Sequence, residues 1–389
     1  MAKHENFISN KVKCYLPKQE LKGTNVSSLK SKSLKILAEN FDKLSNDTLK
    51  EIPPELFLEC IDFIDTSHLS SNHISIDSEW FWKREMKKQS RFLPNLNQYG
   101  LSYKRMFLEQ WLSKQINLPD TRIEDLSSLS EYIWSLHVIF SQSIPTNLVD
   151  RYHQLLNLTS LSICCVQIQD LDSIKTLAQS IFCLKSLTCL SLTNSICIDD
   201  DFIRLLVTEF KEMKQIEEQQ HADICSTLLT LDLSKNKIST DGLHLIVDYF
   251  LGQCEDSVLV ELNLGYNLIR SEAARTIGRV LKNNCSLVHL DLSMNSIGEG
   301  GPLLIEGLLH NKTLRVLNAA CNRLTCSTVP VLMDLLKHDK ISLQQLDLSS
   351  NNFETKDISK LKKIADNCSS EINIDLQCSS DDFILLDKD

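Results

Sequence analysis

The chain has 389 residues, of which 42% are hydrophobic, and its formal net charge is −10 at pH 7. This apolar content suffices for a sizeable core, but no uninterrupted apolar run reaches the roughly 18 residues that suggest a transmembrane helix. The first residues, MAKHENFISN, also lack the apolar stretch of a secretory signal, so we expect a cytoplasmic protein with no membrane segment.

The charge is uneven along the chain. Residues 1–50 contain ten lysines and five acidic residues, a balance of +5. Residues 1–30 are rich in Lys and Ser, and we predict a mobile basic tail there. We expect residues 31–150 to form an α-helical N-terminal domain that caps the open end of the following domain, and this range contains all four tryptophans.

Two segments of this N-terminal domain carry aromatic and basic side chains on predicted helices. The first is EWFWKREMKKQSRF, residues 79–92, and the second is YGLSYKRMFLEQWL, residues 99–112. We predict that they bind a protein partner through Trp80, Trp82, Lys83, Arg84, Tyr99, Lys104, Arg105 and Phe107. The alternative is that the aromatic residues only pack against the first repeats while the charges are solvated. A nucleic-acid site is disfavoured, because no strand pattern carries interleaved aromatics.

A repeat dominates the chain from residue 151 to residue 378. Five segments read L-x-x-L-x-(L/A)-x-x-N-x-(I/L/F), and they start at Leu228, Leu259, Leu287, Leu314 and Leu343. Their steps of 31, 28, 27 and 29 residues are typical of the long form of the leucine-rich repeat. Degenerate copies start at Leu158 and Leu187, and a remnant follows near Ile372. We therefore count about seven repeats plus a terminal remnant.

Each repeat predicts a strand followed by a helix. Side chains alternate between the two faces of a strand, so Leu290 and Leu292 point inward and Asp291 points outward. One repeat alone cannot bury its leucines, so the repeats must stack. The segments between strands carry apolar residues at helical spacing. The predicted fold class is α/β: a ribonuclease-inhibitor-like horseshoe, a solenoid with parallel strands inside and helices outside.

An asparagine follows each of five strands by a fixed offset, where the chain must turn away from the sheet. The asparagine amide carries both donors and an acceptor, and can satisfy the backbone groups left unpaired at such a turn. We therefore predict a structural ladder of Asn236, Asn267, Asn295, Asn322 and Asn351.

Polar residues alternate with the buried leucines and are predicted to face the concave side. We predict a partner-binding surface formed by Asp232, Glu261, Asn263, His289, Asp291, Asn318, Gln345 and Asp347. This small, acidic face suits a basic or helical partner segment held by hydrogen bonds and charge. The alternative is that these residues are only solvated and that a partner binds the N-terminal domain or the outer helices.

One repeat is longer than the others. The step from Leu187 to Leu228 is 41 residues, and the surplus lies in the polar segment 209–227. We expect a lengthened helix there, which is either a tolerated surface insertion or an extra contact arm. Beyond the repeats, residues 379–389 are predicted to form an acidic C-terminal tail.

The sequence does not predict catalysis. It contains no Gly-rich phosphate loop, metal-ligand cluster or nucleophile elbow, so we expect no enzyme, no cofactor, no metal and no small-molecule substrate. Fourteen scattered cysteines without a Cys-x-x-Cys pair predict reduced, mostly buried thiols. A GTPase-activating role would need a positioned arginine or asparagine on an edge of the solenoid. Arg270, Arg315 and Arg323 are the candidates, but nothing distinguishes them from solvated surface residues.

The order of the WFWKR element, the YGLSYKRMFLEQWL segment and the repeats resembles dynein regulatory complex subunit 5, the T-complex-associated testis-expressed 1 family. The resemblance covers most of residues 50–376, and its specific part is the motif Tyr99, Gly100, Lys104, Arg105, Met106, Phe107 and Glu109. Tyr103 stands where relatives are expected to carry Trp. The resemblance implies a non-catalytic subunit of the nexin link in the axoneme of motile cilia and flagella. It would bind other linker subunits and, through them, the doublet microtubules.

A second resemblance points to a different function. IPPELFLECIDFID at residues 52–65, followed by EWFWKREMKK, resembles the two ends of an F-box. An F-box with leucine-rich repeats would imply a substrate adaptor of a ubiquitin ligase. The middle helix of an F-box is missing, because the polar segment HLSSNHISIDS stands in its place.

Overall fold

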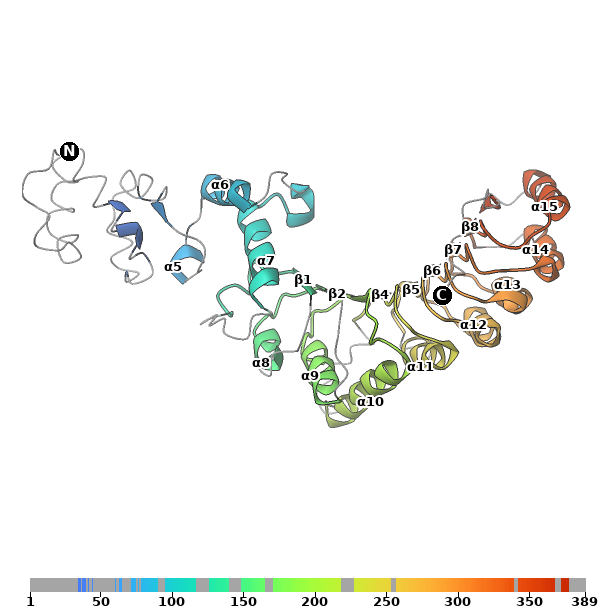
Figure 1. The fold of residues 1–389 in the computed structure, drawn as a ribbon, viewed down its shortest axis with the longest axis horizontal. Coiled ribbons are helices and arrows are strands. Elements are labelled where there is room, and N and C mark those ends of the chain that lie inside the picture. The colour runs from blue at the N-terminus through green and yellow to red at the C-terminus, as the bar shows by residue number, and fades with distance from the viewer. Residues whose placement is uncertain are drawn as a thin grey trace, which may run out of the picture. The chain divides into compact units, whose positions relative to one another are not determined.

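In the computed structural model of the chain (Figure 1), the structure describes residues 34–35, 37–39, 41, 44, 60, 63–64, 71–74, 76, 78–89, 95–116, 126–139, 148–164, 171–217, 227–252, 257–338, 342–367 and 372–377. The predicted tails, most of the F-box-like segment and residues 218–226 lie outside these ranges. The chain divides into two compact units. Unit 1 is Met1–Trp111 with Asp120–Ile133, and unit 2 is Leu112–Pro119 with Trp134–Asp389.

Unit 1 is built around two packed helices. Its described elements are α5 (Ser71–Ile74), α6 (Glu79–Gln89), the 3₁₀ helix η4 (Leu96–Tyr99) and most of α7 (Tyr103–Gln115). The ring centroids of Trp82 on α6 and Phe107 on α7 lie 5.1 Å apart, and both rings are fully buried. The Glu79 carboxylate accepts hydrogen bonds from Ser102 Oγ at 2.7 Å and Tyr103 N at 2.6 Å. It therefore ties α6 to the start of α7, where a negative charge is favoured.

Unit 2 contains a single parallel sheet of nine strands in its described part, in the order β1 to β9. The strands are β1 (Ser135–Ile139), β2 (Ser160–Cys164), β3 (Cys189–Thr193), β4 (Thr230–Asp232), β5 (Glu261–Asn263), β6 (His289–Asp291), β7 (Val316–Asn318), β8 (Gln345–Asp347) and β9 (Asn373–Asp375). Each strand pairs with the next in the chain, which is the topology of stacked repeats.

Helices return the chain from each strand to the next. They are α8 (Leu148–His153), α9 (Leu171–Phe182), α10 (Asp200–Glu217), α11 (Thr240–Phe250), α12 (Ser271–Asn283), α13 (Gly301–Leu308), α14 (Val329–Leu336) and α15 (Thr355–Asn367), with short 3₁₀ turns η6 (Gly298–Gly300) and η7 (Cys326–Thr328). Figure 1 shows that within unit 2 the strands line the inner side of an arc and the helices its outer side. The predicted fold class is confirmed.

The core of unit 2 lies between the sheet and the helices. Leu290 and Leu292 are at most 3% exposed, as are their equivalents in neighbouring repeats. On α12 the buried residues are Ala273, Ala274, Ile277, Gly278 and Leu281, the face that a helix of this spacing turns toward a core. Burial of a leucine side chain contributes roughly 1.5–3 kcal/mol, so stacking repeats stabilises the solenoid mainly through these side chains.

The sheet begins earlier than we predicted. We expected a helical domain up to residue 150, but β1 pairs with β2 in parallel register, with Leu136 opposite Leu161 and Val138 opposite Ile163. Both β1 side chains are buried, so β1 covers the leucine and isoleucine that β2 would otherwise expose. The boundary at residue 150 is therefore wrong, and the sheet gains one strand. The segment SLHVI escaped recognition because it has a valine where the repeat has leucine, and no asparagine follows at the ladder offset.

The ladder asparagines connect successive repeats through hydrogen bonds. Asn295 Nδ2 donates to Leu264 O of the preceding repeat and to Leu292 O of its own, both at 2.9 Å. Its Oδ1 accepts from Ile269 N at 3.0 Å. The same pattern occurs at the other four ladder asparagines, Asn236, Asn267, Asn322 and Asn351. Each side chain donates to one carbonyl of the preceding repeat and one of its own repeat, and accepts a hydrogen bond from a backbone N–H of the preceding repeat. These side chains therefore provide hydrogen-bond partners for the backbone N–H and C=O groups of the turn that ends each strand.

Each of these turns also holds a residue with left-handed backbone geometry. The residue just before the ladder asparagine has a φ between 53° and 58° in five repeats: Lys235, Tyr266, Met294, Cys321 and Ser350. Such angles are uncommon outside glycine. Because the ladder hydrogen bonds recur beside them, the stacking of repeats imposes this turn on ordinary side chains.

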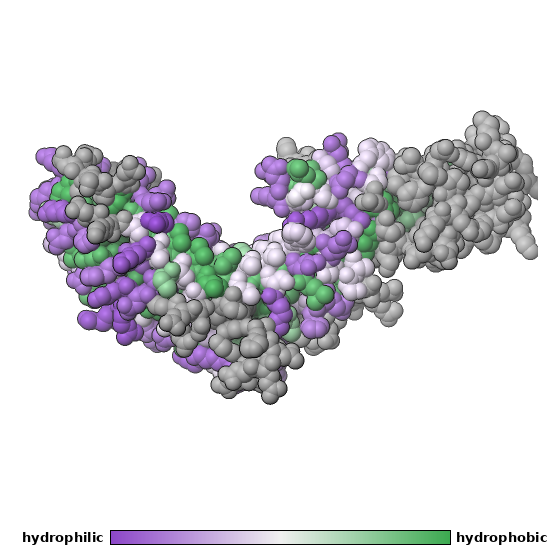
Figure 2. All heavy atoms as spheres, turned by 180° about the vertical axis from the view of Figure 1, so that it is seen from behind, coloured by the Kyte–Doolittle hydropathy of each residue, from purple (hydrophilic) through white to green (hydrophobic). Residues whose placement is uncertain are grey.

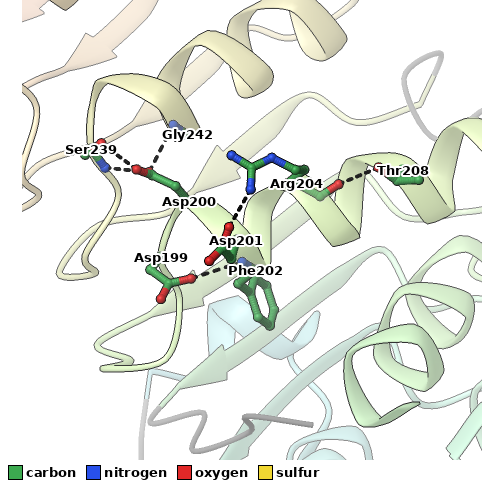
Figure 3. Close-up of polar contacts among 8 residues, drawn as sticks. All are labelled: Asp199, Asp200, Asp201, Phe202, Arg204, Thr208, Ser239 and Gly242. Atoms are coloured by element: carbon green, nitrogen blue, oxygen red, sulfur yellow. Dashed lines mark hydrogen bonds and ion pairs between the residues drawn. The ribbon is translucent and has the colours of Figure 1, made fainter. Parts of the chain in front are cut away.

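The long repeat is held to its neighbour by a carboxylate. Helix α10 has 18 residues and contains the start of the predicted insertion. Asp200 at its first turn accepts hydrogen bonds from Ser239 N at 2.8 Å and Gly242 N at 2.9 Å at the start of α11 (Figure 3). A Cβ atom on Gly242 would lie 2.4 Å from Asp200 Oδ1, so this approach requires glycine. These hydrogen bonds to Asp200 hold the start of α10 beside the start of α11, although the two repeats are separated by a 41-residue step.

Candidate partner-binding surface

The inner face of the sheet presents two rows of side chains between the buried leucines. The strand register aligns them from β4 to β9. The first row is Thr230, Glu261, His289, Val316, Gln345 and Asn373, and the second is Asp232, Asn263, Asp291, Asn318, Asp347 and Asp375. All of these residues are exposed or half-buried. The structure therefore brings together all eight concave residues that the sequence predicted.

The second row has a structural role that we did not predict. Oδ1 of Asp291 accepts the backbone N–H of Ser293 at 2.8 Å, and Oδ1 of Asn263 accepts that of Gly265 at 3.0 Å. The same bond to the residue two positions later occurs at Asp232, Asn318, Asp347 and Asp375. These residues hold the turn after each strand with one oxygen. Asp and Asn are equivalent for this bond, and only the charge distinguishes them.

The rows carry five carboxylates and neither Lys nor Arg. Three contacts run along them: Thr230 Oγ1 donates to Glu261 Oε2 at 3.5 Å, His289 Nδ1 lies 3.0 Å from Glu261 Oε1, and Asn318 Nδ2 donates to Asp291 Oδ2 at 2.9 Å. In the part of the chain that the structure describes, Oδ2 of Asp232 and of Asp347 has no hydrogen-bond partner. The inner face from β4 to β9 is thus a polar surface of negative charge, with carboxylate oxygens available to a ligand.

Three of the predicted partner-binding residues of unit 1 are internal, which corrects that prediction. Trp82 and Phe107 are fully buried, and Lys104 is 5% exposed. Trp82 Nε1 donates to Ile76 O at 2.9 Å, and Lys104 Nζ donates to Tyr132 Oη at 3.0 Å. Aromatic and basic residue types were interpreted as surface anchors, but Trp82 and Phe107 pack against each other between α6 and α7, and Lys104 bonds to Tyr132.

The other predicted residues of unit 1 remain at least partly accessible. Trp80 is 57% exposed, and the Arg84 guanidinium lies 5.6 Å from its ring centroid. Lys83 lies over the ring of Tyr103 at 5.2 Å. Tyr99 and Arg105 are half-buried, and Arg105 Nε pairs with Glu109 at 3.0 Å. This surface keeps one exposed aromatic ring with a cation over it, which is a small anchor for a partner.

The arginines considered for a GTPase-activating role lie outside these rows. Arg270 and Arg323 are exposed, whereas the Arg315 guanidinium donates to Ser342 O at 2.7 Å and so holds the chain before β8. Within the described ranges, no three His, Cys, Asp or Glu side chains come together to hold a metal ion. No helix of those ranges combines the length and apolar character needed to cross a bilayer.

The cysteines depart from the prediction. Among the described cysteines, Cys60 alone is buried, while Cys285 is exposed and the six others are half-buried. Burial raises the pKa of the Cys60 thiol to about 12. The half-buried cysteines lie on strands and turns rather than in the leucine core, which is why their apolar character did not predict their positions.

Sequence reasoning also missed residues that belong to the surface. Asp375 continues the second row on β9, opposite Asp347. Its signal was present in the remnant INIDLQC, because Ile374 takes the place of a repeat leucine and Asp375 follows it. Alignment of the remnant by its inward residues would have found it.

Comparisons with known proteins agree with the repeat architecture. The family described as "Leucine Rich repeat" matches residues 225–247 and 283–301, and "Leucine Rich Repeat" matches residues 342–364. Ribonuclease inhibitor of Sus scrofa is 30% identical over 141 residues, which cover 35% of this chain and 29% of that protein. "NACHT, LRR and PYD domains-containing protein 12" of Mus musculus is 35% identical over 128 residues, or 32% of this chain and 12% of that protein. The chain thus spans less than a third of the length of either relative.

Two matches among solved structures have TM-scores below 0.5. An internalin from Listeria monocytogenes str. 4b F2365 is 18% identical with a TM-score of 0.35, covering 64% of this chain and 63% of that chain. A chain of the Rad7 and Elc1 complex in yeast is 13% identical with a TM-score of 0.39, covering 87% and 85%. The repeat period, the strand-to-helix order of unit 2 and the matched segments together show that unit 2 is built of leucine-rich repeats in the ribonuclease-inhibitor-like arrangement.

Proposed function

We propose that this chain is a non-catalytic adaptor that captures a basic segment of a protein partner on the concave face of unit 2. The observation that carries the proposal is the pair of rows from β4 to β9, which hold five carboxylates and no Lys or Arg. Complementary charge at such a surface increases the association rate and excludes acidic partners. Solenoids expose extended inner surfaces of this kind, which suits an elongated ligand.

The finer proposal places the chain in the nexin link of motile cilia and flagella, as a dynein regulatory complex subunit on the cytoplasmic axonemal cytoskeleton. The resemblance around residues 99–109 supports it. In unit 1 these residues make specific contacts: Gly100 has a φ of 60° at the end of η4, Met106 and Phe107 are fully buried, and Arg105 pairs with Glu109. These motif residues therefore fix how η4 and α7 are arranged, and most of them do not serve as surface residues. The partner segment would belong to another linker subunit.

The test separates the charge of the second row from its structural role. A variant with Asp232→Asn, Asp291→Asn, Asp347→Asn and Asp375→Asn keeps every Oδ1 acceptor, as Asn263 and Asn318 do naturally. We expect recovery of linker subunits from salt-extracted axonemes by the tagged full chain to fall at least about tenfold. The circular dichroism spectrum and Tm should not change.

The matched control neutralises four exposed carboxylates on the outer helices: Asp241, Asp248, Glu272 and Asp334. Recovery should stay at the wild-type level. Unchanged recovery with the concave variant would remove the inner face from the proposal. Localisation of the tagged chain away from the axoneme would contradict the linker assignment, and binding of the cullin-adaptor protein in vitro would favour the F-box alternative instead.

A further inference from the structure

A cleft of about 500 Å³ opens on the outer side of unit 2, between α12 and α13. It is lined by Arg275, Gly278, Arg279, Lys282, Leu303, Glu306, Gly307, Leu309 and His310. In Figure 2 hydrophilic side chains cover most of the outer rim of the arc in the half that contains these helices. The cleft lies on the opposite side of the repeats from the strand face that the proposed function uses.

The floor of the cleft is made by two glycines. A Cβ atom on Gly278 would lie 2.2 Å from Leu303 O, and a Cβ atom on Gly307 would lie 2.4 Å from Gly278 O. The two helices therefore touch backbone to backbone at this point, and no other residue type fits at either position. The missing side chains leave the depression that the longer side chains of α12 and α13 surround.

Three cations line one wall of the cleft without neutralising partners. Arg275, Arg279 and Lys282 are exposed on α12 at positions i, i+4 and i+7, which places them on one face over about 10 Å. None of the three makes an ion pair with another residue of the described ranges. Glu306 is the one carboxylate in the lining, and it too makes no ion pair there. A concentrated positive surface therefore stands on a chain whose net charge is −10.

We propose that this cleft binds an acidic segment of a protein partner, with carboxylates about one helical turn apart that pair with Arg275 and Arg279. Arginine presents a planar fork that matches a carboxylate with two hydrogen bonds, so two arginines one turn apart select paired acidic side chains. Leu303 and Leu309 are half-buried in the lining and offer apolar contact between the charges. An amphipathic acidic peptide therefore fits both the charge and the apolar part of the cleft.

The lining favours a peptide over the other common polyanions. It contains no Phe, Tyr or Trp for bases to stack on, its one ring is the imidazole of His310, and Glu306 opposes a continuous phosphate backbone. A membrane surface would require exposed apolar anchors around the cations, and the two leucines lie within the cleft instead. This proposal does not depend on the concave face, because the two surfaces attract ligands of opposite charge.

The test measures binding of the full chain to a fluorescein-labelled amphipathic peptide with glutamates one helical turn apart and leucines between them. Fluorescence anisotropy should report saturable binding that weakens as salt is added. The variant Arg275→Glu, Arg279→Glu, Lys282→Glu should bind at least about tenfold more weakly, because attraction becomes repulsion at each pair. The Gln variant of the same three residues should lose affinity to a lesser degree, and Glu306→Gln should gain it.

The control reverses three exposed lysines on other outer helices or their ends, Lys211, Lys337 and Lys362, and so makes the same change in net charge. It should bind the peptide like the wild-type chain, and so should the concave Asp→Asn variant. Equal weakening in the lysine control would show a general charge effect and overturn the proposal. Absence of peptide binding would also overturn the proposal. The same holds if the three cations bind duplex RNA or acidic vesicles but not the peptide.

Discussion

Single side chains in unit 2 combine a structural bond with a surface property. Asp291 holds its turn with Oδ1 and presents negative charge with the same carboxylate, and Asn318 makes the same turn bond without charge. The acidity of the concave face is therefore not needed for the fold at these positions. Ladder asparagines differ, because Asn295 uses both its donor and its acceptor inside the turn. A carboxylate could not donate there.

Tyr152 is a residue whose burial makes stability depend on pH. Its ring is fully buried behind the first repeats, and its hydroxyl has no hydrogen-bond partner among the described residues. Burial raises the pKa of this phenol above its usual value. The folded protein therefore holds the proton more tightly than the unfolded chain, so stability is fully present below about pH 10 and is lost above it.

We predict that Tyr152→Phe raises the free energy of unfolding by about 1 kcal/mol at neutral pH, because an unsatisfied buried hydroxyl is removed. Above about pH 10 the wild type should lose roughly 1.4 kcal/mol per pH unit more than the variant. Urea unfolding of both proteins between pH 7 and alkaline pH checks this. Parallel pH profiles would show that Tyr152 reaches water in the folded state.

At the scale of an element, β1 is identified as a strand by its pairing with β2 and not by its own sequence. Leu136 and Val138 face the core, while Ile139 is 50% exposed on the other face. The Trp134 carbonyl, just before β1, accepts hydrogen bonds from Thr159 N and Ser160 N at the start of β2. These bonds extend the backbone pairing of the two strands. The element is therefore part of the solenoid, although it lacks the leucine consensus.

We expect Leu136→Ala to reduce the free energy of unfolding by about 2–5 kcal/mol, because a cavity remains beside Leu161. Ile139→Ala, on the opposite face of the same strand, should change it by less than about 0.5 kcal/mol. Equilibrium denaturation followed by circular dichroism provides both values. Similar losses in the two variants would mean that β1 is not covered as the structure shows.

At the scale of unit 2, stability is a sum of contacts between neighbouring repeats. Among the strands that the structure describes, each central one is paired on both sides, whereas β1 and β9 are paired on one side. In a linear stack the central repeats are stabilised by two interfaces and the terminal repeats by one. Local opening should therefore start at the ends.

We predict a gradient of hydrogen exchange along the sheet. The amide of His289, which donates to Val260 O at 3.0 Å in the centre, should exchange at least about tenfold more slowly than that of Asn373, which donates to Gln344 O at 2.8 Å near the end. Exchange followed by mass spectrometry of peptides from β6 and β9 measures the difference. Equal protection would indicate one cooperative unit instead of a stack.

The sequence by itself determined the period, the alternation of strand and helix, the buried leucines and the positions of the ladder asparagines. These features follow from covalent spacing, because a strand exposes alternate residues to the core wherever the repeat occurs. It also placed the predicted concave residues, since they are the intervening positions of the same strands.

Tertiary structure alone decided which residues of unit 1 are buried, where the sheet begins and what the concave aspartates bond. Trp82, Lys104 and Phe107 could equally have been exposed, because composition does not say which helix packs on α7. The cleft beside Arg275 likewise depends on α13 approaching α12 through Gly278 and Gly307. Each of these properties depends on how two elements pack against each other, and the sequence of one segment does not specify which segment packs against it.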